Sequence, residues 1–174
     1  MTHPEFSHII RLSELGSAPV TGQLHAEADQ LQALAQRFDL PAIKNLRADY
    51  RLKADESRIA FSGTMTSDLE QQCVVSAEAF PVQVEEQFDI AFVPKSDDLE
   101  ETDEVELQTE DCDLIDFEDG RIDLGEALAQ TLYLALDPYP RGPNADAVAK
   151  AKGLQSEEQA GPFGALAALK DKLG

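Results

Sequence analysis

The chain has 174 residues, enough for one domain with a hydrophobic core, and 43% of them are hydrophobic. Its formal net charge of −20 repels phosphate at long range and argues against salt-driven binding of DNA or RNA over the whole surface. The sequence has neither a long apolar run that could span a membrane nor an N-terminal secretory pattern, so we expect a cytoplasmic protein.

The first third of the chain predicts strands around one helix. Residues 6–12 predict a short strand, and residues 26–38 carry apolar side chains at helical spacing until Pro41 blocks the helix. Apolar and polar residues alternate strictly over 46–53 and again over 59–65, which predicts a β-hairpin.

Two more strands and an acidic block follow. Residues 70–75 predict one strand, and residues 80–92 predict a long strand, kinked near Glu86, that ends at Pro94. From Asp97 to Asp119 the chain carries thirteen carboxylates and no Lys or Arg. Such a block either attracts a basic partner or only keeps a loop solvated.

A second helix is marked by its start. Asp123 is a suitable N-cap, and Glu126 stands where a capping box needs its partner. Leu124, Leu128, Thr131, Leu132 and Ala135 recur on one face. Tyr133, Leu134 and Leu136 add a second apolar surface, so we expect the last turns of this helix to be deeply buried.

The end of the chain separates into a linker and a short helix. Residues 141–161 are polar and Ala-rich and predict a flexible linker. Residues 162–174 predict an amphipathic helix whose apolar side chains include Phe163, Leu166 and Leu169. That helix would dock either on its own domain or on a partner.

These elements predict an α+β fold. We expect a curved antiparallel sheet of about five or six strands packed with two helices, followed by the helical tail. The domain should span residues 1–140, with the acidic residues in a loop over 95–119.

Two charged sets are candidate binding residues. The acidic set for a basic partner comprises Asp97, Asp98, Glu100, Glu101, Asp103 and Glu104. The basic set comprises Lys44, Arg47, Arg51 and Lys53, which are either an RNA contact or the polar face of a strand.

The sequence contains no catalytic motif that we recognise. The three histidines lie within the first 25 residues, and neither Cys73 nor Cys112 is part of a C-x-x-C pair. The chain has no phosphate-binding glycine loop and no G-x-S-x-G elbow. We therefore predict no catalytic residue, metal or cofactor. A Mg²⁺-dependent hydrolase or nuclease built on the carboxylates is the remaining enzymatic alternative.

Three segments carry a family resemblance. They are Gly63–Met65 leading to Gln72–Phe80, Arg121–Leu124 leading to Leu134–Pro140, and Pro162–Lys170. In this order, with acidic residues between the first and second, the chain resembles the bacterial YceD family of large ribosomal RNA subunit accumulation proteins. The resemblance covers roughly residues 20–173.

The resemblance implies a role in the synthesis, processing or stability of 23S rRNA and no enzymatic activity. Many members carry a C-x-x-C pair, of which Cys73 matches the first cysteine while Ser76 replaces the second, as in an alphaproteobacterial type of the family. No metal site is therefore expected here. Family members are commonly encoded beside ribosomal protein L32. The implied partner is a basic ribosomal protein, such as L32, or an rRNA-processing factor.

Overall fold

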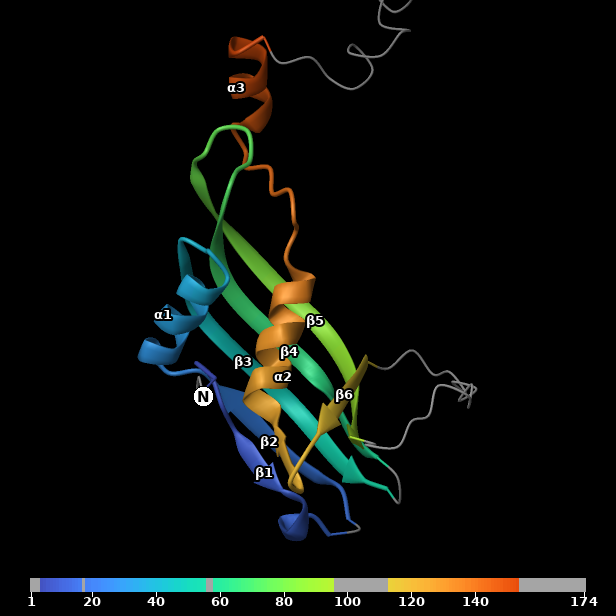
Figure 1. Ribbon diagram of the computed structural model, residues 1–174. Helices are drawn as coiled ribbons and strands as arrows, with labels where there is room; N and C mark the ends of the chain where they lie inside the picture. The colour runs from blue at the N-terminus through green and yellow to red at the C-terminus, as the bar shows by residue number, and fades with distance from the viewer. Residues whose placement is uncertain (1–3, 17, 56–57, 96–112, 154–174) are drawn as a thin grey trace, which may run out of the picture. The chain divides into compact units, whose positions relative to one another are not determined.

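The computed structural model describes residues 4–16, 18–55, 58–95 and 113–153 (Figure 1). The chain divides into two compact units, one of residues 1–70 and 81–136 and the other of residues 71–80 and 137–174. The fold is α+β, as predicted, with a five-stranded sheet, a two-stranded sheet and three α-helices in the described residues.

The larger sheet has the strand order β2-β3-β4-β5-β6. Its strands are β2 (Val20–His25), β3 (Ala42–Ala54), β4 (Ile59–Gln72), β5 (Ala79–Pro94) and β6 (Asp113–Phe117). The predicted hairpin is confirmed, because β3 and β4 pair antiparallel from Ala54↔Ile59 to Ala42↔Glu70.

The prediction of a purely antiparallel sheet is wrong at β6. This strand pairs parallel with β5, with Ile90 opposite Asp113 and Pro94 opposite Phe117. A parallel neighbour needs a crossover of about a dozen residues or more, and residues 95–112 supply that length. The sheet is therefore mixed.

The separate strand predicted over residues 70–75 is also wrong, because β4 runs unbroken to Gln72. The alternation of buried and half-exposed side chains simply continues, with Met65, Ser67 and Leu69 all buried. Ser67 is a polar member of this buried row, and its hydroxyl donates to the Asn45 carbonyl at 2.7 Å. The satisfied hydroxyl allows the strand to pass through the core without a break.

Two helices cover one face of the sheet in the first unit (Figure 1). They are α1 (Ala28–Arg37) and α2 (Leu124–Ala135). From α2, Leu128 and Leu132 are fully buried, as predicted, and they share the core with Phe61, Met65 and Phe92. The other face of β3 and β4 carries polar side chains, so only one side of the sheet contributes to this core.

The start of α2 is fixed by Asp123, as predicted. Its carboxylate accepts the N–H groups of Gly125 at 3.0 Å and Glu126 at 3.2 Å, and also the N–H of His8 at 2.8 Å. The expected return bond from Glu126 is replaced, because its carboxylate accepts from Arg37 instead. A short second sheet reinforces this corner, where β1 (Ile9–Arg11) pairs antiparallel with β7 (Arg121–Asp123).

The last turns of α2 contradict the prediction of deep burial. Tyr133 is 56% exposed and Leu134 is 74% exposed. The helix buries one stripe against the sheet, and the described part of the first unit has no further element over these two side chains. An exposed apolar surface therefore lies at the C-terminal end of α2.

The second unit is described from the β4–β5 turn to α3 (Ala145–Ala151). The turn is held by the chain that follows α2: Val74 N–H donates to the Pro140 carbonyl at 2.9 Å, and Gln71 donates to the Asp137 carbonyl at 3.0 Å. The helix α3 lies within residues 141–161, which composition predicts as a linker. The predicted helix over 162–174 lies outside the described residues.

Candidate functional site

The predicted basic set lies on the solvent side of β3. Arg47, Arg51 and Lys53 are exposed and alternate with buried Ala48 and Leu52, because successive side chains of a strand point to opposite faces. Across the pairs, Arg47 lies opposite Thr66 and Arg51 lies opposite Ser62. The strand thus gathers the predicted cations beside a row of β4 hydroxyls.

Carboxylates interrupt this row of cations. Lys44 forms an ion pair with Glu70 at 2.8 Å, and Asp49, between Arg47 and Arg51, accepts from Gln23 at 2.6 Å. Further along the face, Asp68 accepts from Gln83 and Asn45, and these two hydrogen bonds lower the pKa of its carboxyl group. The face is mixed in charge and not uniformly basic.

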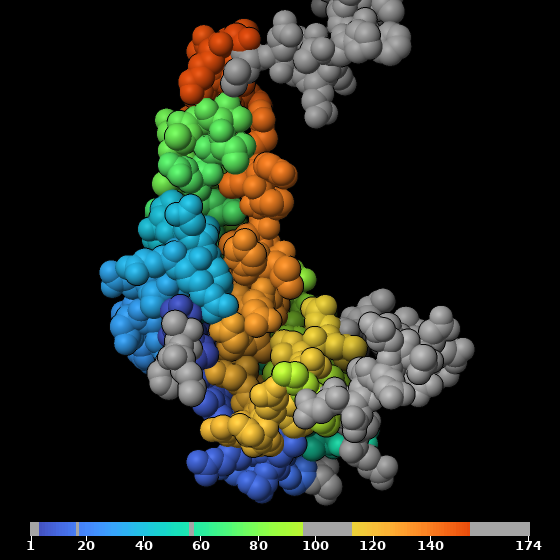
Figure 2. Space-filling view, in the orientation of Figure 1, coloured from blue at the N-terminus to red at the C-terminus, as the bar shows by residue number. Residues whose placement is uncertain are grey.

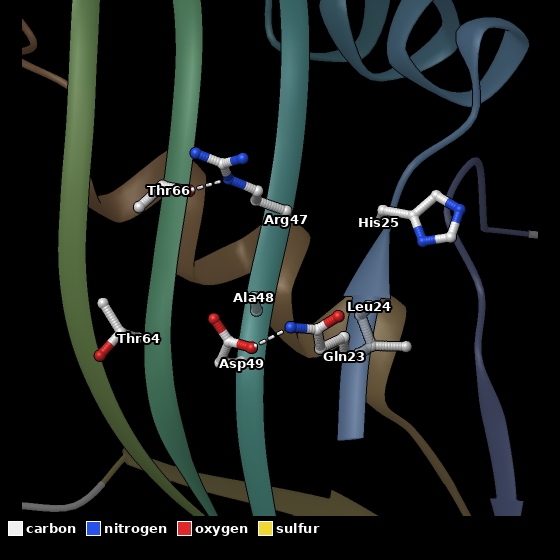
Figure 3. A pocket seen from close by; sticks show the side chains of 8 residues that line it. All are labelled: Gln23, Leu24, His25, Arg47, Ala48, Asp49, Thr64 and Thr66. Carbon is white, nitrogen blue, oxygen red and sulfur yellow. Dashed lines mark hydrogen bonds between the residues drawn. The ribbon is translucent and has the colours of Figure 1, made fainter. Parts of the chain in front are cut away.

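A shallow hollow of about 350 Å³ lies on this face (Figure 3). Its walls include Gln23 and His25 from β2, Arg47 and Asp49 from β3, and Thr64 and Thr66 from β4. Figure 3 shows Arg47 turned to Thr66, with its Nε donating at 2.9 Å. The hollow offers hydrogen-bond donors and acceptors. These groups suit polar contacts with a ligand or partner.

The predicted acidic set, Asp97 to Glu104, and the predicted tail set of Phe163, Leu166 and Leu169 lie outside the described residues. At the C-terminal end of the acidic block, which the structure describes, two carboxylates form ion pairs. Glu118 pairs with Lys95 at 2.5 Å, an interaction that raises the pKa of that lysine, and Asp119 pairs with Arg121 at 3.2 Å.

The described residues on either side of 96–112 belong to β5 and to the edge strand β6. Lys95 N–H donates to the Phe117 carbonyl at 3.0 Å, so the chain leaves β5 beside the last residue of β6, whereas β6 begins opposite Ile90. Asp113 and Asp116 are exposed on β6 and form no ion pair with any described residue. The edge strand therefore carries two exposed carboxylates, of which Asp116 lies near enough to Lys95 to help raise the pKa of that lysine.

Cys73 lies in the second unit, in the turn after β4. Its side chain is buried, and its Sγ accepts the Ser76 N–H at 3.4 Å. The Ser76 side chain and then its backbone N–H stabilise the thiolate, and with Gly142 and Val75 they lower the thiol pKa to about 7 although burial opposes the shift. The sequence did not predict this lowered pKa, because the turn that places Ser76 and the backbone of Gly142 beside the thiol is not evident from local sequence. Only 1% of Cys73 is exposed to solvent.

No cluster of three metal-binding side chains occurs in the described ranges, which include Cys73 and Ser76 but not Cys112. Nor does any helix in these ranges have the length and hydropathy to cross a membrane.

Sequence reasoning missed the surface at the end of α2. A hollow of about 330 Å³ lies between Phe38 and Tyr133, and another of about 350 Å³ lies between α2 and the acidic side chains of β5 and β6. Leu134 borders both hollows. An apolar pattern that continues round the helix was the available signal, but it predicted burial instead of exposure.

One comparison with known proteins gave a match. A family model described as large ribosomal RNA subunit accumulation protein YceD matches residues 61–170. The matched range includes the Cys73 turn, the acidic block and α2. Neither the curated proteins nor the solved structures gave a match.

Proposed function

Because the chain belongs to the YceD family, which is linked to accumulation of large-subunit ribosomal RNA, we propose that it acts by binding a basic protein. The partner would be a basic ribosomal protein, such as L32, or an rRNA-processing factor. The family description names rRNA accumulation and no reaction. The proposed role is therefore a binding step in large-subunit biogenesis that protects or promotes 23S rRNA.

One observation carries this proposal. The sequence from Asp97 to Asp119 holds thirteen carboxylates, and the part of it that the structure describes begins with β6, the edge strand of the larger sheet. A dense negative surface speeds encounter with a cationic protein and disfavours acidic ones. It also repels the RNA backbone, so a protein partner explains the charge better than direct RNA binding does.

The first test is recovery of partners from a lysate with and without nuclease. We expect the tagged protein to retain a basic ribosomal protein or processing factor after nuclease treatment. Loss of every partner on nuclease treatment would contradict the proposal.

The second test removes the charge. A variant with Asn or Gln at Asp97, Asp98, Glu100, Glu101, Asp103 and Glu104 should associate more slowly at low salt and lose much of its salt dependence. The control variant changes six carboxylates elsewhere, Glu14, Asp29, Asp39, Glu157, Glu158 and Asp171, so its net charge is the same. Equal slowing of both variants would mean that the block has no special role.

A second candidate function is direct rRNA binding through β3. Arg51 and Lys53 favour it, because they are exposed and form no ion pair within the part of the chain that the structure describes. In that case Arg51→Gln with Lys53→Gln would reduce RNA binding and the salt slope, and the recovered complexes would be nuclease-sensitive.

A further inference from the structure

The C-terminal end of α2 exposes two large apolar side chains side by side. Tyr133 is 56% exposed and Leu134 is 74% exposed, whereas Leu132, the residue before them, is fully buried. Adjacent exposed apolar residues at the rim of two hollows are typical of a surface that another molecule covers. Figure 2 shows α2, in orange, reaching the surface on the same face as β6, in yellow.

The first hollow is apolar and held in shape. The rings of Phe38 and Tyr133 lie 5.2 Å apart, and Leu134 completes the wall. The guanidinium of Arg37 stands 5.5 Å from the centre of the Phe38 ring and is hydrogen-bonded to Glu126 at 2.7 Å. Since Arg37 is already neutralised by acids of its own chain, the hollow suits an apolar side chain and not an acidic one.

The second hollow is acidic. Glu86 and Asp89 of β5 and Asp113 of β6 line it, its lining includes no Lys or Arg of the described ranges, and Leu134 separates it from the first hollow. None of the three carboxylates forms an ion pair with a residue that the structure describes. A cation with an apolar stem would fit, because Phe88 and Leu134 can contact the stem while the carboxylates bind the charge.

We infer that this surface docks a basic segment of the partner that presents a large apolar side chain next to an Arg or Lys. The inference rests on the proposed function, since it takes the partner to be basic. The two hollows meet at Leu134, so the two anchoring side chains must be neighbours, as are residues three or four apart on a helix. Charge complementarity selects the occupant, because acidic or nucleic-acid ligands would be repelled by the second hollow.

The position of Asp113 links this surface to the acidic block. Asp113 begins β6 and also lines the second hollow, so the block that attracts a basic partner contributes one carboxylate to the docking surface. The block would govern the rate of encounter, and the surface at α2 would govern how long the complex lasts.

The test uses the full chain and, as the probe, large-subunit ribosomal proteins extracted in high salt and freed of RNA. We expect Tyr133→Ser with Leu134→Ser to weaken binding about tenfold or more, mainly through faster dissociation. The control Val74→Ser with Tyr139→Ser removes side chains of matching exposure, 57% and 75%, and should bind like the parent. A second variant, with Glu86→Gln, Asp89→Asn and Asp113→Asn, tests the surface without changing α2 and should also weaken binding.

The outcomes separate the two claims. If the six-substitution variant of Asp97–Glu104 loses binding while both surface variants bind like the parent, the basic partner stands and the docking surface is overturned. If the parent binds none of the extracted proteins, the proposed function fails first. A photo-crosslinker at position 133 should attach to a Lys- or Arg-containing segment of the partner. Crosslinks only to residues 162–173 of the same chain, or to a second copy, would overturn the inference.

Discussion

Leu128 and Leu132 lie one helical turn apart on the buried side of α2, and neither is exposed to solvent. Truncating either to Ala should lower the free energy of unfolding by about 2–5 kcal/mol, because the transfer energy is lost and a cavity remains. Denaturant melts of the two variants measure this. Leu134→Ala, on the exposed side of the same helix, is the control and should stay within about 0.5 kcal/mol of the parent. Equal losses at all three positions would mean that α2 packs by another face.

Side-chain periodicity explains which individual residues could be predicted. Leu128 and Leu132 repeat at helical spacing and are buried, and Asp123 caps the helix as its type and position indicate. Tyr133 and Leu134 were wrongly expected in the core, because periodicity shows which residues share a face but not how much of that face another element covers. Glu126 was expected at the cap but pairs with Arg37, a contact 89 residues away in sequence.

The pair of Arg37 and Glu126 joins α1 to α2. Both oxygens of Glu126 accept from Arg37 at 2.7 Å, and Arg37 also contacts Glu5 at 3.0 Å. The pairing raises the pKa of Arg37 and lowers that of Glu126 below its ordinary value of 4.5. The two helices are therefore linked by a charged contact whose strength depends on the protonation of Glu126.

This link predicts a pH dependence of stability. A carboxylate whose pKa is lower in the folded than in the unfolded state contributes its full stabilisation at pH values above its unfolded-state pKa. That contribution is lost as the pH falls through its folded-state pKa. Glu126→Gln should thus be less stable than the parent near neutral pH, by at most about 1 kcal/mol because the pair is partly exposed. The difference should shrink at pH values below 4.5. Urea melts over this range measure it, with Glu85→Gln as control, and a constant difference would contradict the link.

Among the strands, those with long alternation were predictable and β6 was not. The alternation in β3 and β4 extends over many residues, so the hairpin emerges from the sequence alone. The strand β6 is short, and two of its five residues are Asp, so its local sequence is typical of a solvated loop. It forms because Ile115 and Phe117 pack against the core and because β5 offers a free edge, and neither fact is local.

For the molecule as a whole, the sequence predicted the fold class and the family, and the residues of the binding site remain predictions. The cations of β3 do share one face, but Asp49 and Glu70 lie among them, which composition alone does not show. The acidic set Asp97–Glu104 and the tail set stay untested, since they lie outside the described residues. The surface at α2 forms only when α1, α2, β5 and β6 are assembled.

The parallel pairing of β6 with β5 gives ionic strength a second role, in loop closure. To place Asp113 beside Ile90, the chain must return to β5 within residues 95–112 although this stretch is rich in like charges. Their mutual repulsion adds to the entropic cost of closing the loop, and salt weakens that repulsion, since the Debye length is about 10 Å at 0.1 M.

Hydrogen exchange of the β6 amides should therefore slow as salt is added, while that of the α2 amides should change little. Exchange in β6 that is independent of salt would contradict this account. If it holds, salt has opposite effects on the acidic block and on β6. It weakens the attraction of a basic partner to the block, and it stabilises the strand whose first residue lines the docking surface. In the free protein, β6 would then be least stable under the low-salt conditions in which the partner associates fastest. The positive charges of the bound partner would reduce the repulsion among the carboxylates, as salt does in the free protein.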